Sequence, residues 1–392
     1  MNEFLAMLRE RREAIRRWIA RWLPSWWSRA LAVGLIAFGF VLPLLFVKTS
    51  PFINTEILAL VYVMFALGLN VVVGFAGLLD LGYLAFFALG SYALGWLGSG
   101  FFFKANVHVL VSKYASSIPG IHLNFLMILI CAGLLTAAAG AVIGLPTLRL
   151  RGDYIAVVTL AFGEIIRVFA INGPELKIAG MPLTGGELGI SGVDPPYFPG
   201  LGTFTQLNER PWYWTIFVLV LITLFVNIRL RDSRLGRAWV ALREDEVAAV
   251  SMGIPSVRTK LLAYSIGAAL GGVAGAFLAS YTTLIDAGEF QFGFSIFVLS
   301  MVILGGLGSI WGVVVGALLL ANMNYYLIPN VINSLPSKLG LNFNLTDLQV
   351  SIFGFVLVVV MVLRPQGLIP ERRRRLELTT GIGETEMAEP EA

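Results

Sequence analysis

Long apolar runs dominate the chain, and charged residues or turn-forming Gly, Pro, Asn and Ser bound each of them. A helix needs about 20 mostly apolar residues to cross a bilayer, and most of these runs approach that length. The pattern predicts an all-α polytopic membrane protein with about ten membrane crossings. The expected crossings are 30–47, 57–74, 79–98, 124–145, 154–172, 212–229, 260–281, 292–305, 310–328 and 347–363.

One expected crossing, 292–305, is short for a bilayer, and another, 79–98, contains several glycines. Unsatisfied backbone groups cannot face lipid, so a short segment must be tilted, re-entrant or shielded by its neighbours. The sequence leaves open whether these two segments cross completely.

Composition and charge agree with a membrane protein. The chain is 57% hydrophobic and only 13% charged, which excludes an ordinary soluble enzyme, a disordered protein and a nucleic-acid binder. Basic residues concentrate in 1–29, 146–152, 229–260 and 364–375. An even number of crossings places all four segments on one side, and the positive-inside rule makes that side the cytoplasm.

Three parts are expected along the chain. Residues 1–29 form a basic amphipathic segment, which either lies on the cytoplasmic leaflet or only sets the topology. Residues 30–363 form the transmembrane domain, with a long cytoplasmic loop at 230–259. Residues 364–392 form a basic and then acidic tail, expected to be disordered.

Motifs for catalysis are missing from the sequence. It contains no phosphate-binding P-loop, no H-E-x-x-H and no G-x-S-x-G. Its only cysteine is Cys131 and its only histidines are His108 and His122, so we expect no metal site and no cofactor. An energy source for transport would have to lie in a partner.

Two segments, one in each half of the chain, are rich in glycine. Small residues let helix backbones approach closely, and they also permit broken helices beside a water-filled path. Each cluster therefore serves close packing alone, or a hinge along a translocation path. The candidate glycines are Gly74, Gly77 and Gly82 in the first cluster and Gly305, Gly306 and Gly308 in the second.

Few charged residues lie inside the expected crossings. Asp80 lies at the first glycine cluster, where its carboxylate either caps the following helix or contacts solute. Glu164 and Arg167 are three residues apart, so they can pair on one helical face. The pair either faces the bundle interior for structural reasons, or lines the path and compensates a zwitterionic solute.

The cytoplasmic loop 230–259, which we call the coupling loop, contains a short predicted helix, Arg243–Ser251. Glu244, Asp245 and Glu246 would lie in its first turn, where acids complement the helix dipole. Gly253 is expected to end it, because Ile254–Pro255 forbids continuation. A short exposed helix of this kind suits the transmission of force from a motor domain.

This loop resembles the EAA loop of ABC importer permeases, with an acid at Glu246, two alanines at 248 and 249, and then Gly253. Other segments are similar to the LivM-like permease subunits of high-affinity branched-chain amino-acid importers. They are GLNVVVGFAGLLDLGYLAFFALGSYA at 68–93, LPTLRLRGDYIAVVTLAFGEIIRV at 145–168, PLTGGELGI at 182–190, VILGGLGSIWGVVVGA at 302–317 and LRPQGLIP at 363–370. The chain departs from the family at Val247 and at Glu187–Leu188, where relatives commonly have Pro-Asn.

The resemblance implies a bacterial inner-membrane assembly with both termini of this chain in the cytoplasm. Its partners would be a homologous LivH-like permease, two cytoplasmic ATPase subunits, a periplasmic solute-binding protein and membrane lipid. Thr184, Gly185 and Gly186 would face the binding protein. The expected ATPase-coupling residues are Glu244, Asp245, Glu246, Ala248, Ala249 and Gly253.

We therefore expect a non-enzymatic permease subunit of an ATP-driven importer for branched-chain or related small amino acids. One alternative is the same machine carrying urea or short amides. A second is a stand-alone secondary carrier that uses Glu164, Arg167 and Asp80, which would show uptake driven by an ion gradient without any ATPase. A third is a membrane scaffold, whose removal would leave solute uptake intact.

Overall fold

Local chemistry explains where the long helices begin. In the computed structural model, Pro51 occupies the first turn of α3 (Pro51–Asn70), where its missing N–H group would have had no partner in the helix. At the start of α5 (Phe125–Thr147), the side chain of Asn124 accepts a hydrogen bond from the Leu126 N–H group (3.0 Å). This bond satisfies one of the N–H groups that a helix end leaves unpaired.

The structure describes residues 34, 36–112, 115–148, 154–178, 180–198, 202–332, 351, 354–355, 358–359, 362 and 367–369. The chain divides into two units, residues 1–48 and 49–392. In the first unit, residues 36–41 are helical and a 3-10 turn follows at Leu42–Leu44. The predicted amphipathic segment 1–29 and nearly all of the predicted tail 364–392 lie outside the described residues.

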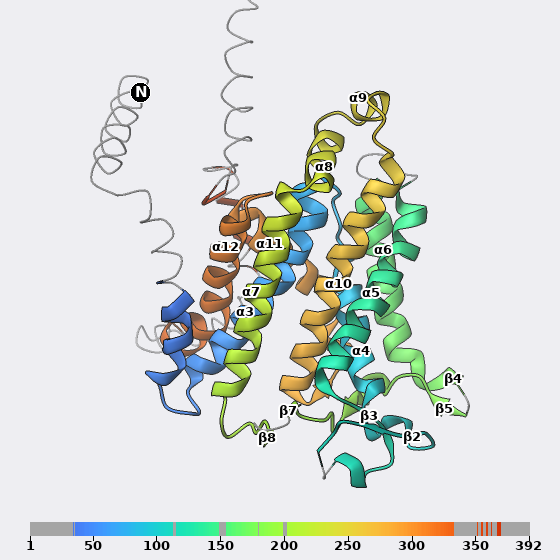
Figure 1. The fold of residues 1–392 in the computed structure, drawn as a ribbon, viewed down its shortest axis with the longest axis vertical. Coiled ribbons are helices and arrows are strands. Elements are labelled where there is room, and N and C mark those ends of the chain that lie inside the picture. Colours follow the sequence, from blue (N-terminus) through green and yellow to red (C-terminus); the bar gives the residue numbers. More distant parts are fainter. Residues whose placement is uncertain are drawn as a thin grey trace, which may run out of the picture. The chain divides into compact units, whose positions relative to one another are not determined.

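The second unit is a bundle of helices (Figure 1). Its helices are α3 (Pro51–Asn70), a π-helical turn η2 (Val71–Phe75), α4 (Leu84–Leu97), α5 (Phe125–Thr147), α6 (Tyr154–Asn172), α7 (Arg210–Asp232), α8 (Arg234–Glu244), α9 (Glu246–Ser251), α10 (Ser256–Thr282), α11 (Phe292–Gly305), α12 (Ile310–Asn322) and a π-helical segment η8 (Met323–Ile332).

Among the described residues, six helices are long and apolar enough to cross a membrane, and α4 and α11 are shorter apolar helices. This confirms the predicted helical membrane protein. The predicted crossing 347–363 has only scattered described residues. The predicted segment 79–98 is wrong at its start, because residues 79–83 are not helical and α4 begins at Leu84.

α3 and α10 form the centre of the bundle. α10 packs against α3, α4 and α5, and α3 also contacts α7, α11 and α12. Over an 18-residue apolar stretch of α3, 94% of the residues are buried, whereas only 22% are buried over the corresponding stretch of α6. α6 is therefore peripheral, and α3 belongs to the core.

Short strands gather at one end of the bundle, and we call it the strand end. They are β1 (Gly98–Ser99), β2 (Asn106–Val109), β3 (Gly120–Leu123), β4 (Lys177–Ile178), β5 (Met181–Pro182), β6 (Ile190–Ser191), β7 (Tyr197–Phe198), β8 (Gly202–Thr203) and β9 (Leu284–Ile285). β3 lies between β1 and β2, and antiparallel pairs join β4 to β5, β6 to β9 and β7 to β8. α8 and α9 project at the opposite end, the α9 end (Figure 1).

Candidate functional site

The coupling loop forms two helices, α8 and α9, rather than the one predicted over 243–251. The backbone of Asp245 is extended, and its Oδ1 accepts a hydrogen bond from the Ala248 N–H group (2.9 Å). Asp245 therefore caps a new helix, and the prediction that Glu244 lies in the first turn of that helix is wrong. An aspartate side chain that satisfies the N–H groups of the next turn is the physical reason for the break.

The predicted end of α9 is confirmed. Gly253 has a φ of +86°, its N–H group donates to the Val250 carbonyl, and the Ile254 N–H group donates to the Ala249 carbonyl. These two bonds form a Schellman motif, which glycine adopts without the strain that a Cβ atom would add.

α9 is fastened to the first turns of α10. Lys260 Nζ lies 2.7 Å from Glu246 Oε1, and the Ser256 hydroxyl donates to the same oxygen. Ala249 is buried on the inner side of α9. α8 is tied to α10 as well, because the buried Trp239 indole N–H donates to the Thr259 carbonyl (2.7 Å). A force on α9 would therefore move α10.

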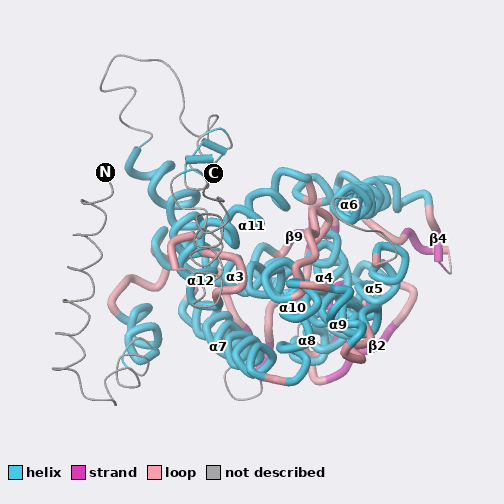
Figure 2. The backbone as a smooth tube through the Cα atoms, turned by 90° about the horizontal axis from the view of Figure 1, so that it is seen from above, coloured by secondary structure: helices cyan, strands magenta, loops and turns pink. Residues whose placement is uncertain are grey.

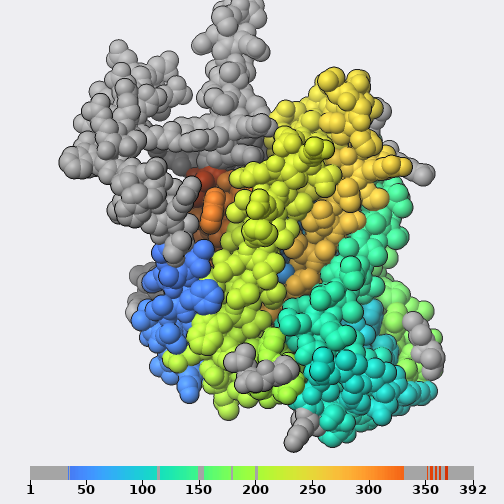
Figure 3. All heavy atoms as spheres, in the orientation of Figure 1, coloured from blue at the N-terminus to red at the C-terminus, as the bar shows by residue number. Residues whose placement is uncertain are grey.

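The outward side of α9 carries apolar side chains that the described residues leave exposed. Val247 is 77% exposed, Val250 is 49% exposed and Met252, just beyond the helix, is 84% exposed. The loop reaches beyond the long helices in the space-filling view (Figure 3), and it lies over α10 when the bundle is seen from above (Figure 2). Exposed apolar patches mark interaction sites. Sequence reasoning missed these three residues, although apolar side chains within a charged loop were the available signal.

An arginine connects α8 with the first glycine cluster. The Arg243 guanidinium donates to the Gly74 carbonyl in η2 (2.6 Å). Gly77 has a φ of +69°, and a Cβ atom there would lie 2.4 Å from Arg243 Cγ. Glycine is therefore required at residue 77 for both its backbone conformation and this close approach.

The second glycine cluster packs on the first. Asn70 Oδ1, at the end of α3, accepts a hydrogen bond from the Gly308 N–H group (3.0 Å) in the turn between α11 and α12. A Cβ atom on Gly74 would lie 2.7 Å from Gly308 N, and one on Gly305 would lie 2.3 Å from the Gly312 carbonyl oxygen. Gly306, in the same turn, has a φ of +120°. Two clusters more than 200 residues apart thus meet beside α8.

Asp80 is buried in the connection between η2 and α4. Its Oδ1 accepts a hydrogen bond from the Gly82 N–H group (2.9 Å). The prediction that Asp80 caps the following helix is wrong, because α4 begins two residues beyond Gly82 and its N-cap residue, Tyr83, makes no side-chain cap. A Cβ atom on Gly82 would lie 1.8 Å from the Thr159 carbonyl oxygen, so this connection packs directly on α6.

α4 begins partway along the bundle. The Tyr83 hydroxyl donates to the Gly267 carbonyl near the middle of α10 (2.6 Å), and its ring stacks on Phe65 of α3 (4.8 Å). With 14 residues, α4 is about 21 Å long, shorter than the hydrocarbon core of about 30 Å. Its neighbours α3, α5 and α10 shield it, as expected for a short segment.

Glu164 and Arg167 form the predicted pair, with Arg167 Nε 2.8 Å from Glu164 Oε2. The two side chains are more than 30% exposed, so the prediction that they face the bundle interior is wrong for this chain. Near Gly82, α6 contributes Thr159 and Gly163 to the packing, whereas its Val157 and Ile165 side chains are exposed. The pair is not brought together with the glycine clusters. Glu164, but not Arg167, lines a hollow on α6 together with Phe169.

At the strand end, the three predicted binding-protein contacts build a turn. The buried Thr184 hydroxyl donates to the Ala170 carbonyl (2.7 Å) and accepts a bond from the Gly186 N–H group (3.3 Å). A Cβ atom on Gly185 would lie 1.8 Å from the Gly189 carbonyl oxygen. The side chain that this turn presents outward is that of Leu188, which is 91% exposed.

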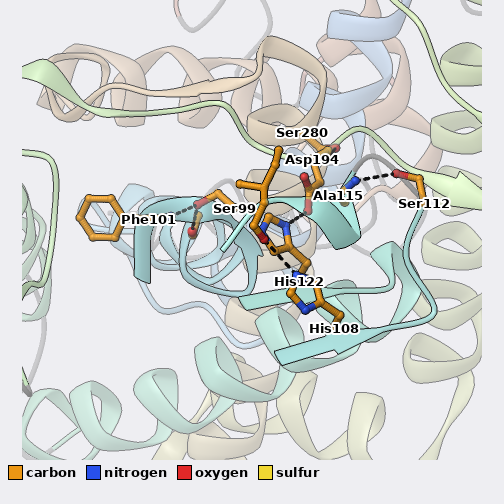
Figure 4. A network of polar contacts seen from close by, with 10 residues as sticks. Ser99, Phe101, His108, Ser112, Ala115, His122, Asp194 and Ser280 are labelled. Atoms are coloured by element: carbon orange, nitrogen blue, oxygen red, sulfur yellow. Dashed lines mark hydrogen bonds and ion pairs between the residues drawn. The ribbon is translucent and has the colours of Figure 1, made fainter. Parts of the chain in front are cut away.

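A polar network ties the strand end together (Figure 4). The His122 Nδ1–H group donates to Asp194 Oδ2, and the His108 ring stacks on the His122 ring with centroids 5.1 Å apart. The Asp194 N–H group donates to the Gly98 carbonyl (2.8 Å), and the Ser280 hydroxyl of α10 donates to the Asp194 carbonyl (3.4 Å). Burial raises the pKa of Asp194, and the neighbouring histidines oppose that shift.

These features define a class of protein. Apolar helices with two glycine-rich breaks, beneath a short exposed helix that is fastened to the core, are typical of a membrane permease. Residues 52–363 match the family described as branched-chain amino acid transport system, permease component, so the chain belongs to this family.

Known proteins support this membership. The chain is 36% identical over 363 residues to the high-affinity branched-chain amino acid transport system permease protein LivM of Escherichia coli K12, covering 88% of this chain and 76% of that protein. It is 27% identical to the probable branched-chain amino acid transport permease protein LivM of Methanocaldococcus jannaschii, covering 79% and 91%. A shorter likeness, 34% over 119 residues, covers 30% of this chain and 37% of the Escherichia coli permease protein LivH. No solved structure gives a significant match.

Proposed function

We propose that this chain carries branched-chain amino acids across a bacterial inner membrane as one of two permease subunits. The names of its relatives support this solute class. The likeness to LivH supports a homologous second permease as the partner. Two cytoplasmic ATPase subunits would supply energy, and a periplasmic binding protein would supply solute.

The observation that carries the proposal is the fastening of an exposed apolar helix to the central helix of the bundle. Val247, Val250 and Met252 would contact the ATPase, while Glu246 holds α9 on Lys260. α10 has 27 residues and is about 40 Å long, so it reaches from α9 to the strand end. Closure of the ATPases would shift α9 and α10 together and alternate the access of a central path.

The two glycine clusters would serve as the hinge. Arg243 is hydrogen-bonded to Gly74 and Asn70 is hydrogen-bonded to Gly308, so a displacement of α8 would be transmitted to both clusters. Asp80 and Gly82 lie in the same connection and would move with it. Ala248 and Gly253 would set the shape of α9 that the ATPase meets.

The pair Glu164–Arg167 would line a path shared with the second permease. Charged groups are costly against lipid, and these side chains are partly exposed on this chain. A polar surface of the second permease, or a water-filled path, on this face of α6 would remove that cost. The pair remains a candidate for compensating a zwitterionic solute.

Cysteine chemistry in the assembled transporter tests this proposal. After Cys131→Ala, we expect Met252→Cys to cross-link to an ATPase subunit and to react only with reagents that enter the cytoplasm. Leu188→Cys, with a similar exposure at the strand end, should react with impermeant reagents from outside. Labelling of Met252→Cys from the outside would overturn the orientation, and with it the cytoplasmic placement of both termini.

A further inference from the structure

A cavity of about 660 Å³ lies among α3, α4, α10, α11 and η8, beside the connection between α10 and α11. Its volume is within the range of small-molecule sites, about 300–1,000 Å³. It shares no residue with the two glycine clusters or with the Glu164–Arg167 pair. The proposed hinge and coupling elements therefore leave it unexplained.

Aromatic rings form the inner wall of the cavity. The Tyr62 ring lies 5.4 Å from Phe294, 5.6 Å from Phe297 and 5.6 Å from Tyr325, measured between centroids. Phe87 of α4 lies 5.5 Å from Phe294. These rings offer an apolar surface without an ionic group, which suits a branched alkyl side chain.

One carboxylate lines the cavity toward the strand end. Glu289 is the only charged residue of the lining, and among the described residues it makes no ion pair. Burial, and then repulsion from Asp286, raise its pKa. An ionised carboxylate in this position is stabilised by a cation close to it. The amide side chains of Gln291 and Asn324 border the same space.

We infer that this cavity holds an apolar α-amino acid on its way through the permease, with its ammonium group at Glu289 and its side chain among the aromatic rings. The inference rests on the proposed transport function and names the solute site within it. The solute carboxylate would lie toward the amides of Gln291 and Asn324, which can donate hydrogen bonds to it. The cavity thus matches both ends of the zwitterion and its side chain.

Uptake of labelled leucine into proteoliposomes tests the site, using the complete transporter and saturating loaded binding protein. We expect Glu289→Gln to lower leucine uptake about tenfold, because it removes the counter-charge of the ammonium group. ATP hydrolysis stimulated by the binding protein should stay within about twofold, since the coupling helix is unchanged. Glu289→Asp should restore much of the uptake, and the matched control Glu175→Gln, at the strand end of α6, should behave as the unaltered protein.

The pH profile separates a charge role from a structural one. Because the pKa of Glu289 is raised, its charge is lost as the outside pH falls through that pKa, so uptake should fall from pH 8 to pH 5. Glu289→Gln should lose this dependence, relative to Glu175→Gln at each pH. Full uptake by Glu289→Gln, or an unchanged pH profile, would overturn the inference. Absence of leucine uptake by the unaltered transporter would instead overturn the proposed function.

Discussion

The two ends of the bundle are built differently. At the α9 end, a short helix turns apolar side chains outward, and Val247 and Met252 are mostly exposed. At the strand end, His122, Asp194 and Ser280 join three segments far apart in the sequence through hydrogen bonds. α10 connects the two ends, with Lys260 in its second turn and Ser280 in its last.

The difference indicates a division of labour. An apolar surface that the chain leaves open is suited to a partner, since covering it removes apolar area from water. A network of hydrogen-bonded polar groups instead holds loops in one arrangement. We interpret the α9 end as the place where force enters and the strand end as a fixed frame around the solute entrance.

The largest effect is expected where the glycine break packs on α6. Gly82→Val would place its Cβ atom 1.8 Å from the Thr159 carbonyl oxygen, a backbone atom that cannot move alone. Overpacking of this kind costs about 1–3 kcal/mol, and more where backbone must shift. We expect the yield of assembled transporter in detergent to fall about tenfold or more. Gly34→Val, where nothing lies within 4 Å, is the control. A normal yield of Gly82→Val would show that the connection is not packed on α6.

The next largest effect is expected at the end of α9. A Cβ atom at residue 253 would have no other atom within 4 Å. Gly253→Asp should therefore lower the free energy of unfolding only through the strain of a positive φ, by about 1 kcal/mol. The added charge beside Met252 should prevent productive seating of the ATPase. We expect insertion and assembly to persist, while uptake and transport-stimulated ATP hydrolysis fall at least about tenfold.

Gly192→Asp is the matched control for this change. Gly192 lies at the strand end with a φ of +73° and nothing within 4 Å of a Cβ atom, so both variants carry the same strain and the same charge. If Gly192→Asp lost transport as severely as Gly253→Asp, backbone strain rather than the α9 surface would be the cause.

The apolar runs predicted the long helices well, because a helix that crosses a membrane must be apolar and must satisfy its own backbone. The ends at Asn172 and Gly305 fall where the sequence placed them, and Gly253 ends α9 as predicted. Local chemistry also explains why the single helix predicted over 243–251 is wrong at Asp245, where α8 ends and α9 begins. An aspartate favours an N-cap as well as a first turn, and the sequence alone does not choose between these two positions.

Contacts between distant segments were beyond such reasoning. The bond from Arg243 to the Gly74 carbonyl joins residues 169 positions apart, and Asn70 bonds to Gly308 across 238 positions. No spacing rule links them, because tertiary packing determines them. Glu246 was predicted as a contact to the ATPase, yet its carboxylate is occupied by Lys260. Its coupling role therefore stays a prediction.

A moderate effect is expected on the apolar side of α9. Met252→Asp places a charge where an apolar contact is proposed, and we expect the ATPase subunits to be retained about 5- to 10-fold less well on the permease. The measurement is the ratio of ATPase to permease after affinity purification. Leu188→Asp makes a similar change at the strand end and should keep that ratio unaltered. Equal losses in both variants would remove the distinction between the two ends.

The smallest effect is expected in the polar network. Asp194→Asn replaces the carboxyl group that accepts from His122, and we expect a loss of about 1–2 kcal/mol, because the buried His122 ring loses a well-matched hydrogen-bond partner. A shift of a few degrees in the melting temperature of the transporter would report this loss. Amide exchange should quicken in β3 and around residue 194, and it should stay unchanged in α9, because local opening at the strand end breaks no hydrogen bond of α9.

The pH dependence of this loss sharpens the test. The pKa of Asp194 is raised by burial, so the folded protein holds this proton more tightly than the unfolded chain does. Stability from this group is therefore present at low pH and is lost as the pH rises through its folded pKa. The unaltered protein should then exceed Asp194→Asn by more near pH 4 than near pH 7. A difference that shrinks toward pH 4 would mean that attraction to His122, rather than burial, governs Asp194, and that the strand end is held by an ion pair that acid opens.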